Sequence, residues 1–363
     1  MKPNVAAAKA ALSHIEQDEN ANAIRSKSRD FFWYSPVLKE KLDHVVADFV
    51  VNPKSEAEVI EVLKVCYAHD VPVTVRGAGT GNYGQAMPLA GGCVMHMRNF
   101  NKVKEIHPGR VIAEPGCIIR DLDAETRAHS GQELRMMPST FATATIGGFI
   151  SGGSGGIGSC TWGALRDHGN IIRLRVVTME EEPQILEFRG DELPRVSHAY
   201  GTNGILTEVE MPLAPAYDWV ELFVGFDDFM ESARFAMGVA AQDGILIKLA
   251  SPIEAPIPKA YFQRVAPHVD EGTSLVAMLV APHSMDGFHT YMKTEFPSAR
   301  IIYDSTDNDW DRGPGPVAEY TWNHTTLRAL KVDPSITYLQ VRYGFPEHLS
   351  LVEKMRDEFS PEV

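Results

Sequence analysis

Two glycine-dense segments contain the residues best suited to hold a reactive group. The first runs Val73-Thr-Val-Arg-Gly-Ala-Gly-Thr-Gly-Asn-Tyr-Gly84, and the second spans residues 138–158. Glycine adopts positive φ and lets a backbone N–H come close to a ligand, and successive N–H groups of this kind form concave nests for phosphate oxygens. Because the segments are well separated and each also carries Ser, Thr or Asn, they predict a two-sided cradle for a pyrophosphate.

The first segment also matches the letters of the dinucleotide-binding fingerprint. Gly79, Gly81 and Gly84 read G-x-G-x-x-G after a β-rich run. The fingerprint requires a helix to begin inside the loop, so that its N-terminus faces the pyrophosphate. Residues 85–92 instead contain Pro88 and a pair of glycines, which disfavour a helix. We therefore reject a Rossmann-type site, because its required context is missing.

Several further motifs follow one another along the chain. They comprise residues 52–58 opening a helix, Arg76-Gly-Ala-Gly-Thr80, Pro88-Leu-Ala-Gly-Gly92, residues 111–116 before Asp121-Leu122, Pro138-Ser-Thr140, Ala144-Thr-Ile-Gly-Gly148 and residues 198–207. Each motif alone is weak, but in this order they resemble the FAD-binding domain of the vanillyl-alcohol oxidase / p-cresol methylhydroxylase (PCMH) superfamily. The resemblance extends from about Val50 to Pro215, close to half of the chain.

The resemblance implies which residues contact the cofactor, FAD. The first wall of the pyrophosphate site then comprises Arg76, Gly77, Ala78, Gly79, Thr80, Gly81, Asn82 and Gly84. The opposite wall, along the flavin and diphosphate, comprises Pro138, Ser139, Thr140, Thr145 and Gly148, continued by Gly152, Gly155 and Ser159, with backbone groups of Ile205 near the adenosine part. For any single glycine among these, an ordinary turn is the alternative.

We expect the FAD to be bound non-covalently. Many relatives attach it through a histidine in the first loop, but residues 77–85 contain none, and His96 and His107 lie in or beyond the next strand pattern. The sequence around Cys160 does not resemble the cysteine attachment of other members. Cys160 is therefore interpreted as a small packing residue.

Enzymes of this superfamily take a hydride from a carbon that bears a hydroxyl or amine, while the protein positions the substrate and supplies a base. His324 is the candidate base, with Tyr320 and Asn323 beside it. Arg342, on a strand predicted at residues 336–343, is a candidate for holding a substrate carboxylate. A structural histidine and an ordinary surface cation are the alternatives. The metal-binding histidine and acidic motifs of some relatives are not visible, so we predict no metal.

The elements around these residues predict an α+β fold. Residues 55–58 form a capping box before a helix, flanked by strand-like runs in a β-α-β unit; a second helix at 121–130 and strands at 171–177, 184–188 and 205–211 follow. After Pro215 the periodicity predicts the order β-α-β-β-α-β, which is typical of a ferredoxin-like unit. We therefore predict an N-terminal helical arm (1–41), a two-lobed PCMH-type FAD-binding domain (42–216) and a ferredoxin-like cap domain (217–363) that is incomplete or returns only briefly at its C-terminus.

Composition narrows the class of partner. A formal net charge of −14 in 363 residues argues against nucleic acid or anionic membranes. No run of residues approaches the ~20 apolar positions that span a bilayer, and the N-terminus lacks a secretory pattern. Four cysteines without metal-ligand spacing fit reduced thiols. We expect a cytoplasmic protein with a small-molecule substrate, and a homo-oligomer remains open.

Three functions are compatible with these features. The first is an FAD-dependent oxidoreductase of a small 2-hydroxy acid such as lactate or glycolate, by analogy with the histidine-free Arg-Gly-Ala-Gly-Thr loop. The second is an FAD enzyme acting on aromatic or benzylic alcohols. The third is a flavoprotein subunit or truncated module that needs a partner chain. The sequence does not distinguish oxygen, a quinone, a cytochrome or a partner flavoprotein as the electron acceptor.

Overall fold

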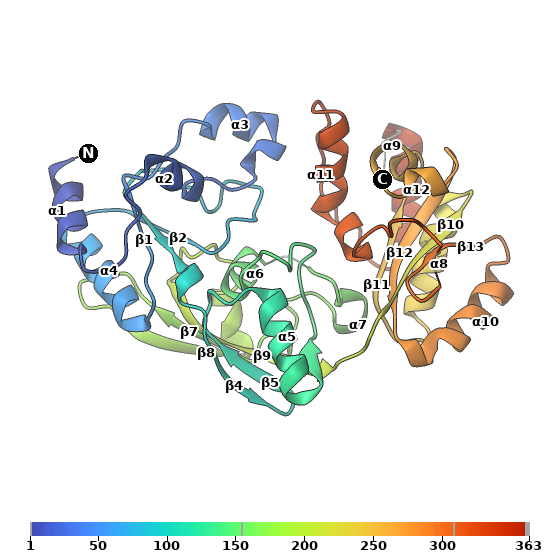
Figure 1. The fold of residues 1–363 in the computed structure, drawn as a ribbon, viewed down its shortest axis with the longest axis horizontal. Coiled ribbons are helices and arrows are strands. Elements are labelled where there is room, and N and C mark those ends of the chain that lie inside the picture. The colour runs from blue at the N-terminus through green and yellow to red at the C-terminus, as the bar shows by residue number, and fades with distance from the viewer. Residues whose placement is uncertain (1, 154, 308, 360–363) are drawn as a thin grey trace. The chain divides into compact units, whose positions relative to one another are not determined.

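The structure is a computed structural model that describes residues 2–153, 155–307 and 309–359. The chain forms two compact units, coloured along the sequence in Figure 1. The first unit comprises Met1–Gly156 and Ala164–Ala216, and the second comprises Ile157–Gly163 and Tyr217–Val363. A short piece of the second glycine-rich segment therefore belongs to the second unit. None of the described helices is long and apolar enough to cross a membrane.

A three-stranded parallel sheet carries the first glycine loop. Its order is β1 (Phe49–Val51), β3 (Cys93–His96), β2 (Val73–Arg76), so β3 lies between the two strands of the predicted β-α-β unit. Helix α4 (Glu56–Ala68) connects β1 to β2, and its N-cap hydroxyl on Ser55 accepts the Glu58 N–H at 3.2 Å, as the capping box predicts.

The N-terminal arm is packed onto this part of the molecule. Helix α1 (Pro3–Ala11) buries Val5 and Ala8 in the same hydrophobic core as α4 and the three strands. Helix α2 (Ala21–Lys27), a 3₁₀ turn η1 (Phe32–Tyr34) and α3 (Pro36–Leu42) follow before β1. Residues 1–41 thus lie within the first compact unit.

A larger antiparallel sheet completes the first unit. Its strand order is β4 (Val103–His107), β5 (Arg110–Ala113), β9 (Ile205–Pro215), β7 (Arg173–Val177) and β8 (Ile185–Arg189), and β6 (Gln132–Leu134) also pairs with β9. The strands predicted at 171–177, 184–188 and 205–211 are confirmed. Helix α5 (Ile119–Ser130) ends, as predicted, at Gly131, whose φ of 64° provides the left-handed C-cap. The short elements are η2 (Met97–Asn99), α6 (Ile146–Gly152) and η3 (Gly190–Arg195).

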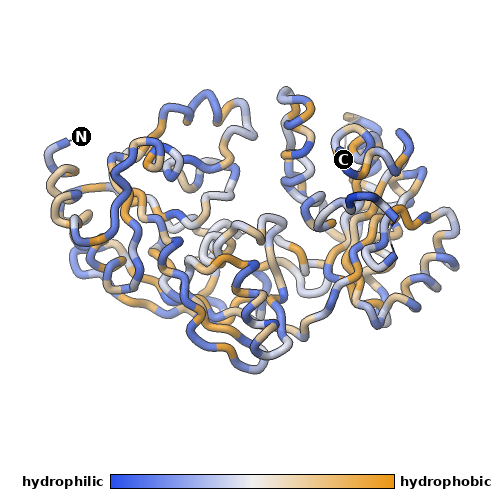
Figure 2. The backbone as a smooth tube through the Cα atoms, viewed as in Figure 1, coloured by the Kyte–Doolittle hydropathy of each residue, from blue (hydrophilic) through white to orange (hydrophobic). Residues whose placement is uncertain are grey.

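The second unit follows the predicted strand and helix order. Strands β10 (Val220–Phe226), β11 (Ile247–Ile253), β12 (Ser274–Val280) and β13 (Arg300–Asp304) form an antiparallel sheet in the order β11-β12-β10-β13. Helix α8 (Phe229–Ala240) follows β10, and α10 (Met285–Glu295) precedes β13. Every residue of β12 is buried, and Figure 2 shows hydrophobic residues concentrated along the strands. The turns between these elements are α9 (Ile257–Tyr261), η4 (Ala266–His268) and η5 (Pro282–Ser284).

The piece of the second unit that comes from the glycine-rich segment lies along β11. Helix α7 (Ser159–Trp162) is preceded by Gly158, whose N–H donates to the Lys248 carbonyl at 2.8 Å. Cys160 packs against the hydrophobic core of this unit, and burial raises the pKa of its thiol to about 11. A protonated, partly buried thiol agrees with the packing role expected of Cys160.

The strand predicted at residues 336–343 is wrong. The chain here forms η6 (Val317–Tyr320), α11 (Asn323–Val332) and α12 (His348–Phe359). The segment between α11 and α12 pairs with no described strand. Leu339 is 90% exposed and Val341 62% exposed. Alternating apolar and polar residues gave the strand pattern, but a strand also requires a hydrogen-bonding neighbour, and the described residues provide none.

Candidate functional site

The first glycine loop presents a row of unused hydrogen-bond donors. It leaves the sheet at the carboxyl end of β2, and its residues up to Gly81 are half-buried. Among the described residues, the backbone N–H groups of Ala78, Gly79, Thr80 and Gly81 donate to no acceptor. No helix forms between Gly84 and β3, which confirms the rejection of a Rossmann-type loop. Adjacent unpaired N–H groups suit an anion with several oxygens.

Arg76 places a buried positive charge against this row of donors. Its side chain is buried, and its guanidinium donates to the carbonyls of Arg29 and Ala78. The Arg76 Nε is buried without a partner among the described residues. Burial lowers the pKa of Arg76 to about 10, although the nearby Asp30 opposes this shift, so the group is charged at neutral pH. The guanidinium occupies the place that a Cβ at Gly79 would need, and Gly79 has a φ of +68°.

Residues 28–45 form a further wall of the loop, here called the N-terminal wall. The Phe31 N–H donates to the Gly81 carbonyl at 2.8 Å, and the buried Asp30 carboxylate accepts the N–H of Phe32 at 2.8 Å and that of Ala86 at 3.5 Å. Burial raises the pKa of Asp30. Phe32, Val45 and Met87 share a small hydrophobic core with Leu38 and Leu42. Sequence reasoning missed this wall, because no local motif links it to a loop about fifty residues away.

The second glycine-rich segment begins with buried residues and then starts a helix. Pro138 and Ser139 are buried, whereas Thr140 is half-buried. Thr145 is the N-cap of α6, and its hydroxyl accepts the Gly148 N–H at 3.2 Å. The N–H groups of Ile146 and Gly147 donate to the carbonyls of Cys117 and Pro115, each at 2.9 Å. The first turn of α6 has therefore already used the donors that a phosphate would need.

Thr145 has a different position from the one expected. Only 1% of its surface is exposed, so it does not line an open wall. Its hydroxyl lies against Gly77, where a Cβ would overlap it. The two glycine-rich segments therefore meet at Gly77 and Thr145, within the first unit. This contact confirms that the segments lie side by side, as a two-sided cradle requires.

The remaining cofactor candidates lie in three places. Gly152 ends α6, and no described atom lies within 4 Å of the place for its Cβ; Gly155 follows it in the first unit. Ser159 begins α7 and belongs to the second unit. Ile205 begins β9 and packs in the core that Val75 of β2 borders.

Residues 198–204 join the two glycine-rich segments on another side. His198 and Tyr200 have φ values of 52° and 53°, and their N–H groups donate to the carbonyls of Ile150 at 3.0 Å and Ser151 at 3.1 Å, near the C-terminus of α6. Gly201 packs against Val75. This segment thus holds the end of α6 near β2.

The catalytic candidates all lie in the second unit, and Tyr320 is not retained. Its side chain is fully buried, it stacks edge-on with Phe262, and its hydroxyl donates to the Pro314 carbonyl at 2.7 Å. The Arg328 guanidinium covers the ring at 3.7 Å from the ring centroid. A core side chain with a satisfied hydroxyl does not contact a substrate, so the expectation for Tyr320 is corrected.

The other three candidates are accessible to different degrees. His324 lies half-buried in the first turn of α11, and burial lowers the pKa of its imidazole, although Glu319 opposes this shift. The Asn323 carbonyl Oδ1 accepts a hydrogen bond from Gln340 at 2.9 Å. Arg342 is exposed in the extended segment before α12. Asn323 and His324 are neighbours in the chain, and the hydrogen bond from Gln340 brings the segment that contains Arg342 next to Asn323.

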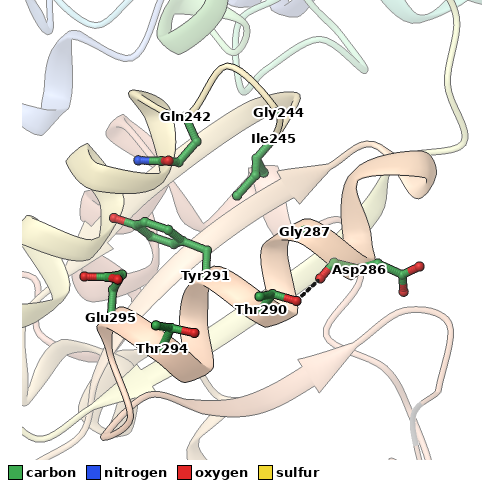
Figure 3. Close-up of a pocket in the computed structure, with 9 residues that line it drawn as sticks. All are labelled: Gln242, Gly244, Ile245, Asp286, Gly287, Thr290, Tyr291, Thr294 and Glu295. Atoms are coloured by element: carbon green, nitrogen blue, oxygen red, sulfur yellow. Dashed lines mark hydrogen bonds between the residues drawn. The ribbon is translucent and has the colours of Figure 1, made fainter.

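Neither metal ligands nor a pocket add to these candidates. The described residues contain no group of three or more His, Cys, Asp or Glu side chains placed to hold a metal. A pocket of about 510 Å³ lies beside α10 in the second unit. Tyr291 and Glu295 are among its lining residues (Figure 3). None of the expected site residues lines it, so we do not assign it to the cofactor or the substrate.

The comparisons with known proteins agree with this cradle. Residues 47–186 match the FAD binding domain family. The glycolate oxidase subunit GlcD of Escherichia coli (strain K12) is 32% identical over 207 residues, which cover 54% of this chain and 40% of that protein. The D-lactate dehydrogenase of Anaerostipes hadrus is 26% identical over 254 residues, covering 64% of this chain and 51% of that protein. The chain thus spans about half the length, or less, of these curated relatives.

A solved structure shows the same fold. Alkyldihydroxyacetonephosphate synthase superposes with a TM-score of 0.70 at 17% identity, over 92% of this chain and 67% of that chain. The residues of the cradle also fit the diphosphate of FAD, because the four unpaired N–H groups follow Arg76 in the loop. The buried Arg76 guanidinium lies against Gly79, and its Nε has no partner among the described residues. Residues 47–186 therefore carry an FAD-binding domain, with FAD as its cofactor, and the chain is similar to a glycolate oxidase subunit and to a D-lactate dehydrogenase.

Proposed function

We propose that this protein is an FAD-dependent oxidoreductase that oxidises the CH–OH group of a small 2-hydroxy acid such as lactate or glycolate. The observation that carries the proposal is the row of unpaired N–H groups at Ala78–Gly81, with the buried Arg76 guanidinium beside Ala78 and Gly79. The substrate class is supported by the names of two relatives, a glycolate oxidase subunit and a D-lactate dehydrogenase.

The residues of the first unit would hold the cofactor. The N–H groups of Ala78, Gly79, Thr80 and Gly81 would donate to the diphosphate, and Arg76 would supply the compensating positive charge. When bound, FAD accepts a hydride at flavin N5. We propose that it is held without a covalent bond, since residues 77–85 contain no histidine. His96 is the first histidine after this loop, and its Nδ1 is hydrogen-bonded to Asn52 at 2.9 Å in a part-buried position.

The second unit would supply the substrate-side groups. Its sheet order, β11-β12-β10-β13, supports the interpretation as a ferredoxin-like cap domain. His324 would accept the hydroxyl proton of the substrate, because burial favours its neutral form. Asn323 would hydrogen-bond the same hydroxyl or the carboxylate, and the exposed Arg342 would pair with the carboxylate.

A partner chain is a second candidate. The relative from Escherichia coli is named as a subunit, which favours the third function considered from the sequence, a flavoprotein subunit that completes its site with another chain. A substrate panel with a dye acceptor, run with and without oxygen on the purified chain, separates the two. Reduction of the dye by lactate or glycolate supports a self-sufficient enzyme. If the FAD-loaded chain reduces the dye with no compound of the panel, the result favours the subunit.

The cofactor assignment has its own test. Acid precipitation of the purified yellow protein should release the FAD into the supernatant. Flavin that stays in the pellet would contradict non-covalent binding. A protein that takes up no FAD on reconstitution would remove the cofactor from the proposal.

A further inference from the structure

The two glycine-rich segments are joined by one contact at the centre of the cradle. Thr145 caps α6, and its Oγ1 accepts the Gly148 N–H at 3.2 Å. The same oxygen fills the space beside Gly77 in which a Cβ would otherwise lie. The next Thr145 atoms are farther away, with its Cβ at 3.3 Å and its Cγ2 at 3.4 Å from that place. The obstacle to a larger residue at position 77 is therefore a single hydroxyl oxygen.

The need for glycine at position 77 comes from packing and not from backbone conformation. Gly79 and Gly84 have φ values of 68° and 76°, which side chains rarely adopt, but Gly77 has no left-handed φ. An alanine could adopt the backbone conformation at position 77 without strain. Only the approach of α6 excludes it. Gly77 lies directly after Arg76 and directly before the unpaired N–H groups of residues 78–81. A displacement of Gly77 therefore moves the Arg76 side chain and these N–H groups together.

Thr145 itself presents almost no surface to a ligand. It is 1% exposed, its hydroxyl accepts from Gly148, and the adjoining donors of Ile146 and Gly147 are already bonded. A polar residue in this position acts on the site through the residues that it holds. Its two contacts connect the start of α6 to the first residue of the phosphate-facing loop.

We propose that Thr145 is a positioning residue for FAD binding, which sets the register between the two walls of the cradle through a contact that only glycine at position 77 permits. The proposal rests on the proposed function, in which the loop after Arg76 holds the FAD diphosphate. It predicts that removing the Thr145 hydroxyl restores FAD binding that a larger residue at position 77 has weakened, because the hydroxyl and the new side chain occupy the same space.

The test is a set of four proteins: the native chain, Gly77→Ala, Thr145→Ala and the double variant. In Gly77→Ala the new methyl overlaps the Thr145 Oγ1, so the loop moves and FAD should bind at least about tenfold more weakly. An effect of this size is typical of the coupling free energy between two residues in contact. In Gly77→Ala/Thr145→Ala the oxygen is gone and the methyl meets Cβ at 3.3 Å, a tight contact that a small shift relieves. The double variant should bind FAD several-fold more tightly than Gly77→Ala.

Thr145→Ser is the matched control. Serine keeps the Oγ1 and the N-cap, so Thr145→Ser alone should bind FAD like the native chain, and Gly77→Ala/Thr145→Ser should stay as weak as Gly77→Ala. Affinity is measured from the change in flavin fluorescence on titrating apoprotein, at a temperature where circular dichroism shows all variants to be folded. The melting temperatures of the apoproteins are recorded in parallel, because a residue with a purely structural role would change them while leaving the affinity of the folded proteins alone.

The outcomes separate this inference from the proposed function. Rescue by alanine but not by serine at position 145 supports the positioning role. If the double variant binds as weakly as the product of the single effects predicts, or if serine rescues as well as alanine, the inference is overturned while FAD binding stands. If the native apoprotein takes up no FAD, the proposed function fails first, and the inference with it.

Discussion

Gly79→Ala is the sharpest perturbation of the phosphate-facing loop. Gly79 has a φ of +68°, and a Cβ there would overlap the Arg76 guanidinium. A left-handed conformation costs a non-glycine residue about 1–2 kcal/mol. Arg76 is 8% exposed and donates to two carbonyls, so it gives way only by losing hydrogen bonds. Hydrogen bonds to charged groups are each worth about 1.5–3 kcal/mol, part of which water restores.

Because FAD binding must restore the native loop, these terms give an expected loss of roughly 2–4 kcal/mol of binding free energy. This loss corresponds to an affinity for FAD reduced roughly 30- to 700-fold. The assay is fluorescence titration of the apoprotein with FAD. Gly109→Ala is the matched control, because Gly109 has a φ of +80° with no described atom within 4 Å of its Cβ position and lies in the β4–β5 turn. It should lower the melting temperature while leaving FAD affinity unchanged. If Gly79→Ala bound FAD as tightly as Gly109→Ala, Arg76 would not be part of the site and the reasoning would be refuted.

Two further predictions concern the second unit. Because burial lowers the pKa of His324 from 6.5, a base role predicts that the rate of flavin reduction falls only as pH drops through this lowered pKa, with its midpoint below 6.5. A stopped-flow pH profile measures it, and an identical profile in folded, FAD-loaded His324→Gln would exclude His324 as the base. Tyr320→Phe removes the hydrogen bond to the Pro314 carbonyl, so it should lower the free energy of unfolding by about 1 kcal/mol and reduce the melting temperature accordingly. Turnover should stay nearly unchanged. A large loss of turnover with unchanged stability would restore Tyr320 to the mechanism.

The parts of the fold that were predictable are those specified by neighbours in the sequence. The capping box before α4, the glycine that ends α5 and the missing helix after Gly84 each depend on a few adjacent residues, and each is confirmed. The succession of strands and helices along the second unit also follows from periodicity. Residues 336–343 show the limit of this reasoning, since an alternating pattern without a partner strand does not form a strand.

The candidate site was less predictable because distant contacts decide it. Thr145 was placed on a wall by motif order, but its hydroxyl is committed to Gly148 and packs on Gly77. Tyr320 looked polar in the sequence and is a core residue in the structure. The carbonyl of Arg29 and the carboxylate of Asp30 complete the surroundings of Arg76 from a segment with no recognisable motif.

The N-terminal wall has a consequence for how this domain can be exchanged between proteins. The family match begins at residue 47, two residues after the wall ends. A fragment cut at that boundary would lose the acceptor for Arg76, the donor to Gly81 and the hydrophobic partners of Met87. The unit that can be recombined or grafted with its cofactor affinity intact therefore has to include residues 28–45. The family match therefore begins inside the unit that these contacts define, after the residues that complete the surroundings of Arg76 and Gly81.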